Sequence, residues 1–102
     1  MKQHILPKQA QEVTEEEFYS IFNGDIVVRK DWYKFHHKKI TIGLMIEFLH
    51  NRKWNLKITR LETLNTFNVS NDETNGTSYY RDELCDALWE AVKHEITKRE
   101  DV

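Results

Sequence analysis

The segment 81–99 constrains the fold of this 102-residue chain most strongly, because its side chains separate by helical period. At about 100° of rotation per residue, its apolar residues fall on one side of a helix. This side holds Leu84, Cys85, Leu88, Ala91, Val92 and Ile96, with Trp89 at its border. The opposite side holds Asp82, Glu83, Asp86 and Glu90. Most of the stability of such a helix comes from packing its apolar side, so the rest of the chain must cover that side.

Two further helices are predicted, at 15–23 and 42–51. Thr14 and Glu17 have the spacing of a capping box, in which each side chain satisfies a free backbone N–H group. Thr41 can cap the second helix in a similar way. Apolar residues recur at helical spacing in both segments. A short helix is also expected around 31–37.

The strand signals lie between the second and the last of these helices. Apolar and polar residues alternate over 54–60, which is typical of a half-buried strand. A second β-type run covers 63–69, and 77–80 is a candidate third strand after the turn signal Asn75-Gly76. The chain therefore predicts an α+β fold, a small antiparallel sheet of two or three strands packed by helices.

Length and composition favour one domain over 1–102, with residues 1–12 as a loosely docked N-terminal arm. The single cysteine, Cys85, fits a reducing compartment. The first residues lack the apolar core of a secretion signal, and no stretch is apolar enough for a membrane span. We therefore expect a cytoplasmic protein with no membrane partner. Nothing in the sequence specifies an oligomeric state.

The stretch WYKFHHKK, residues 32–39, is the richest in chemical groups. His36 and His37 are adjacent and point in different directions in regular structure, so they do not form a chelating pair. The chain has no C-x-x-C or HExxH spacing. Cys85 and His94 lie on opposite sides of the predicted last helix and cannot form a dyad there. We expect no catalytic residue, no metal and no cofactor, and so no enzyme.

Charge is distributed unevenly along the chain. Residues 29–60 carry nine Lys or Arg against two acids, although the whole chain carries a net charge of −2. This basic segment could neutralise phosphates of a nucleic acid. It could equally face the protein's own acidic ends. The candidate nucleic-acid contacts are Arg29, Lys30, Lys34, Lys38, Lys39, Arg52 and Lys53.

The sequence contains two other candidate sites. Asp82, Asp86 and Glu90 follow one side of the predicted last helix and could bind a basic protein partner. A weaker alternative is a small pocket, for catalysis or for holding a nucleotide. It would be built around His36 or His37 together with Tyr79 or Tyr80.

The segments 38–49 and 82–93, KKITIGLMIEFL and DELCDALWEAVK, resemble small proteins encoded by phages and prophages of Gram-positive bacteria. That family consists largely of uncharacterised accessory proteins. The resemblance implies a protein that binds a host or phage protein, in some cases one of a host defence system. It brings no site residues with it. We therefore expect a non-enzymatic protein-binding module, with nucleic-acid binding as the alternative.

Overall fold

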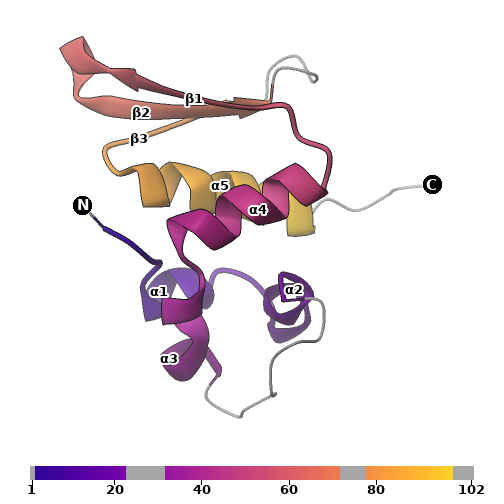
Figure 1. The fold of residues 1–102 in the computed structure, drawn as a ribbon. Coiled ribbons are helices and arrows are strands. Elements are labelled where there is room, and N and C mark those ends of the chain that lie inside the picture. The colour runs from indigo at the N-terminus through magenta and orange to yellow at the C-terminus, as the bar shows by residue number, and fades with distance from the viewer. Residues whose placement is uncertain (1, 23–31, 72–77, 98–102) are drawn as a thin grey trace.

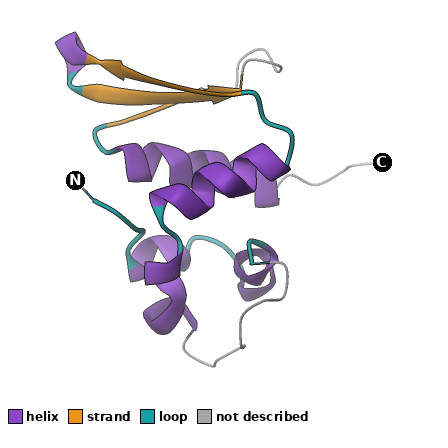
Figure 2. Cartoon of the chain, viewed as in Figure 1, coloured by secondary structure: helices purple, strands orange, loops and turns teal. Residues whose placement is uncertain are grey.

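The computed structural model describes residues 2–22, 32–71 and 78–97. These residues form three layers (Figure 1). A sheet forms the top layer, two helices cross beneath it, and shorter N-terminal helices lie below them. The distribution of helices, strands and loops is shown in Figure 2.

The sheet consists of β1 (Leu56–Leu61), β2 (Thr66–Asn71) and β3 (Ser78–Arg81). The strands are antiparallel in the order β1-β2-β3, so β1 and β3 are edge strands. Val69 in the central strand pairs with Ile58 on one side and Tyr79 on the other. The α+β prediction, with a small antiparallel sheet packed by helices, is confirmed.

Among the described residues, helices cover one face of the sheet (Figure 1). Val69 is completely buried against them, and its neighbours in register, Ile58 and Tyr79, share that face. The other face carries small polar side chains of Thr, Ser and Asn together with the larger Lys57, Leu61 and Tyr80. The alternation predicted for 54–60 is matched only in part, because Leu56 is half-buried and Lys57 exposed, whereas Ile58 is exposed and Thr59 half-buried.

The middle layer consists of α4 (Ile42–Asn51) and α5 (Leu84–Thr97), which contact each other; α5 also contacts β2 and β3. Thr41 caps α4 as predicted, because its hydroxyl oxygen accepts a hydrogen bond from the Leu44 N–H at 3.1 Å. The apolar side of α5 supplies much of the core, with Leu88, Trp89 and Val92 among the buried residues.

The bottom layer consists of α1 (Pro7–Ala10), α2 (Glu15–Ser20), α3 (Trp32–His36) and the 3₁₀ turn η1 (His37–Lys39). The predicted capping box begins α2. Thr14 N–H donates to Glu17 Oε1 at 2.8 Å, and Glu17 N–H donates to Thr14 Oγ1 at 3.1 Å. Trp32 is buried, while the side chain of Phe35 is outside the described set.

The N-terminal segment 2–12 differs from the loosely docked arm expected from the sequence. Ile5 and Ala10 are completely buried. Ile5 N–H donates to the Ile40 carbonyl, and Ile42 N–H donates to the Gln3 carbonyl. Apolar burial and backbone pairing together fix this segment against the start of α4.

Several predicted boundaries differ from the structure by a few residues. The helix predicted over 15–23 ends at Ser20, and the strand predicted over 54–60 begins at Leu56. The run 63–69 was expected to be a strand throughout, but η2 (Glu62–Leu64) is a 3₁₀ turn and Asn65 adopts a left-handed conformation with φ of 49°. Strand β2 therefore begins at Thr66. The last helix was expected from residue 81, but Arg81 pairs with Phe67 in the sheet, so α5 begins at Leu84. Residues 98 and 99 lie outside the described range.

Candidate functional site

The acidic side of α5 is partly covered by the N-terminal segment. Lys2 Nζ lies 2.5 Å from Asp86 Oδ1, and Gln9 Nε2 donates to the same oxygen at 2.9 Å. Lys2 Nζ also donates to Gln9 Oε1 at 2.7 Å. Asp86 thus already has a cation and an amide as partners, whereas Asp82 is exposed.

Glu90, the third candidate on this side, is also paired within the chain. Its Oε1 lies 3.0 Å from Lys93 Nζ and 3.5 Å from Arg81 Nη2. Lys93 Nζ also lies 3.2 Å from Glu12 Oε1, which accepts a hydrogen bond from Trp89 Nε1 at 2.8 Å. Two of the three predicted partner-binding carboxylates therefore stabilise contacts inside the protein.

The basic candidates fall into two groups around α4. Lys34, Lys38 and Lys39 lie on α3 and η1 before its start, and Arg52 and Lys53 follow its end. The helix has ten residues and is about 15 Å long, so the groups are well separated. All five side chains are exposed, and none forms an ion pair with an acid in the described ranges. Arg29 and Lys30 lie outside the described residues.

The histidines and tyrosines expected to form a small pocket lie on opposite sides of the molecule. His36 and His37 belong to the bottom layer, and Tyr79 and Tyr80 belong to β3 in the sheet, with α4 and α5 between them (Figure 1). His37 Nδ1 instead lies 2.9 Å from the Tyr33 carbonyl oxygen. The predicted pocket is therefore not formed by these residues.

Cys85 has the chemistry of a core residue. Burial, the largest effect, raises the pKa of its thiol to about 11; Lys2 lowers the pKa, while Asp86 and Glu83 raise it. A thiol with this pKa is protonated at neutral pH and is a poor nucleophile. Within residues 2–22, 32–71 and 78–97, no group of three or more His, Cys, Asp or Glu side chains could hold a metal ion.

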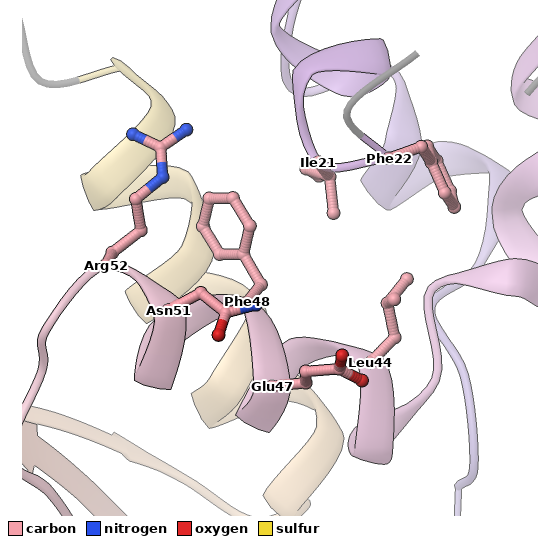
Figure 3. Close-up of a pocket in the computed structure, with 7 residues that line it drawn as sticks. All are labelled: Ile21, Phe22, Leu44, Glu47, Phe48, Asn51 and Arg52. Carbon is pink, nitrogen blue, oxygen red and sulfur yellow. The ribbon is translucent and has the colours of Figure 1, made fainter. Parts of the chain in front are cut away.

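A groove lies between the end of α2 and α4 (Figure 3). Ile21 and Phe22 approach from the α2 side, and Leu44 and Phe48 face them from α4. Its polar lining residues are Glu47 and Asn51 of α4 and Arg52, the residue that follows the end of this helix. The groove has a volume of about 380 Å³. Its lining is therefore an apolar floor with a polar rim along one helix.

Several properties of the groove suit a macromolecular contact. Phe22 and Leu44 remain partly exposed, whereas Ile21 and Phe48 are buried and fix the floor. The guanidinium of Arg52 lies 4.9 Å from the centre of the Phe48 ring, which holds this cation at the rim. An apolar floor with charged groups at its edge is typical of sites that bind an apolar side chain of a partner.

The sequence did not predict this groove. Ile21 and Phe48 read as ordinary core residues, and no single segment contains both walls. One signal was present: Leu44 is apolar but lies off the stripe formed by Ile42, Met45 and Leu49. Such a residue can pack against a second element, but single apolar residues are also common on protein surfaces, so this signal alone does not identify a groove.

No described helix has the length and apolar character needed to cross a bilayer.

Comparison with protein-family models, with curated proteins and with solved structures finds no match to this chain.

Proposed function

We propose that this protein is a non-enzymatic binding module that holds an apolar segment of a partner protein in the groove between α2 and α4. The observation that carries this proposal is the combination of partly exposed Phe22 and Leu44 over a floor of buried apolar side chains. Recognition of a partner segment in an apolar groove is a recurring mode of protein binding.

The lining indicates which segment would fit. The apolar floor favours an aliphatic or aromatic anchor, such as those on one side of an amphipathic helix. Glu47 and Arg52 stand at the rim and carry opposite charges, so they would favour a partner with a cation and an anion flanking that anchor. The polar groups all lie on α4 or directly after its end, whereas a small-molecule site usually has polar groups that converge on the ligand.

The resemblance of segments 38–49 and 82–93 to phage and prophage accessory proteins supports a partner from the host or the phage. A component of a host defence system, which the protein would inhibit, is one such partner. The paired state of Asp86 and Glu90 makes the acidic side of α5 a weaker candidate surface than the groove.

Affinity capture from an infected or lysogenic host, followed by a groove variant, tests this proposal. Leu44→Glu places a carboxylate in the groove, and it does so in the first turn of α4, where the helix dipole tolerates a negative charge. Leu64→Glu makes the same change at a leucine that is 69% exposed, in η2 at the tip of the β1–β2 hairpin. A partner captured by wild type and Leu64→Glu but lost with Leu44→Glu supports the groove. Equal capture by all three contradicts it.

Nucleic-acid binding remains the second candidate, and it is favoured by the exposure of five cations that lack ion-pair partners among the described residues. These are Lys34, Lys38, Lys39, Arg52 and Lys53. Phosphate contacts would make binding fall by orders of magnitude between about 50 and 200 mM salt. Absence of binding to duplex and single-stranded DNA and RNA at low salt would exclude this function.

A further inference from the structure

We propose that two copies of this protein associate through the open edge of β1, forming a continuous six-stranded sheet. The two β1 strands run antiparallel, with Ile58 of one copy opposite Ile58 of the other. This inference concerns the sheet and does not depend on the groove between α2 and α4.

The edge of β1 offers unpaired backbone groups. β1 pairs with β2 on one side only, and no described backbone hydrogen bond reaches its other side. The strand has six residues, so it presents an edge roughly 20 Å long. Alternate N–H and C=O groups along such an edge are free to pair with another strand.

The helix-facing side of β1 is incompletely covered. α5 lies against β2 and β3, and β1 contacts α4, yet Ile58 remains 39% exposed although it shares a face with the completely buried Val69. A large apolar side chain beside an open strand edge would lose water if a second strand were added there.

The sequence of β1 is complementary to itself in one register. With Ile58 opposite Ile58, Leu56 lies opposite Arg60 of the other copy on the helix-facing side. Lys57 lies opposite Thr59 on the polar face. No cation lies directly opposite another cation, so the main electrostatic obstacle to edge pairing is absent.

The register leaves one like-charge contact. The two Lys57 side chains are diagonal neighbours, about 7–8 Å apart, on the exposed face of the sheet. Salt screens such a repulsion. Association of this kind therefore stays constant or strengthens as salt increases, unlike association driven by opposite charges.

The other edge strand is less suited to the same contact. β3 has only four residues, and Arg81 at its end is already engaged with Glu90 of α5. The longer β1, with an exposed isoleucine near its middle, is the edge that a second copy pairs with.

Analytical ultracentrifugation over a range of protein concentrations tests the association. The wild type is expected to shift from one chain mass to two as concentration rises. Ile58→Lys should remain at one chain mass, while Leu64→Lys, at an exposed leucine outside the strand, should associate like the wild type. Ile58→Thr keeps a β-branched residue and serves if Ile58→Lys does not fold. A wild type that stays monomeric at every concentration, or an Ile58→Thr variant that associates unchanged, overturns the proposal.

Cross-linking tests the register. Residues directly opposite in an antiparallel pair have Cα atoms about 4.5–5.5 Å apart, within the range that a disulfide bridges. Ile58→Cys should therefore form a covalent dimer with oxidised glutathione as oxidant. Thr59→Cys places its two thiols on the diagonal and should link much more slowly. Wild type, whose only cysteine is the buried Cys85, is the blank. Faster linking of Thr59→Cys than of Ile58→Cys overturns the register.

Discussion

Asp86 lies at the centre of the contact between the N-terminal segment and α5. Its carboxylate oxygen binds both Lys2 and Gln9. The side chain is 31% exposed, so water screens the ion pair only in part. The contacts of the Asp86 carboxylate with Lys2 and Gln9 therefore stabilise the folded state.

Asp86→Asn should therefore lower the free energy of unfolding by about 1 kcal/mol. Asp82→Asn makes the same change four residues earlier, at an exposed carboxylate, and should change stability by less than about 0.5 kcal/mol. Urea denaturation of both variants measures the difference. Equal effects at the two positions would contradict the pairing of Asp86 with the N-terminal segment.

Cys85 should make stability depend on pH in the alkaline range. Burial raises the pKa of its thiol from 9.0 to about 11 in the folded protein. As pH rises, the thiol of the unfolded chain loses its proton before the thiol of the folded chain does. The contribution of the Cys85 thiol to the free energy of unfolding is therefore complete below pH 9 and is lost as pH rises towards 11. Cys85→Ala should be less stable at pH 8 but lose less stability between pH 9 and 11. Denaturation at several pH values checks this, and parallel pH profiles would contradict it.

The start of α4 is stabilised by the cap at Thr41, and Leu44 in the first turn of this helix lines the groove. Thr41→Ala removes the acceptor of the Leu44 N–H and should cost about 1 kcal/mol of unfolding free energy. Thr41→Ser keeps the hydroxyl oxygen and should cost much less. Thermal denaturation compares the two variants; a loss of the same size in both would show that the methyl group, and not the cap, matters at this position.

Local patterns predicted most of the elements because each depends on residues close in sequence. The capping box at Thr14 and Glu17 and the cap at Thr41 appear in the structure, and the run 54–60 contains most of β1, although burial along β1 does not alternate at Ile58 and Thr59. The start of β2 was missed because Asn65 adopts a left-handed conformation in a 3₁₀ turn, which the apolar pattern of 63–69 does not reveal. The start of α5 was missed because Arg81 pairs in the sheet, a contact with residue 67 that helical periodicity does not include.

The N-terminal segment 2–12 contributes buried side chains to the hydrophobic core. Ile5→Ala should cost about 2–4 kcal/mol of unfolding free energy, because Ile5 is completely buried. Leu6→Ala, at the next residue and 50% exposed, should cost less than about 1 kcal/mol. Chemical denaturation separates the two. A small effect of Ile5→Ala would mean that the segment is loosely attached, as its sequence had suggested.

The candidate sites could be predicted only in part, because they depend on contacts between distant segments. Asp86 and Glu90 lie on α5, whereas Asp82 precedes the helix. The pairing of Asp86 with Lys2, and of Glu90 with Arg81 and Lys93, depends on how distant segments pack. The groove brings Phe22 together with Leu44, and no local pattern relates these two residues.

The proposed function depends on partner binding in the groove between α2 and α4. The affinity of the captured partner for groove variants measures this dependence. Titration calorimetry with wild type, Leu44→Glu and Leu64→Glu compares three dissociation constants under one condition. A carboxylate buried against the partner's apolar anchor should weaken binding at least tenfold, about 1.4 kcal/mol or more. We expect this loss for Leu44→Glu and wild-type affinity for Leu64→Glu. Unchanged affinity of a folded Leu44→Glu variant would contradict it.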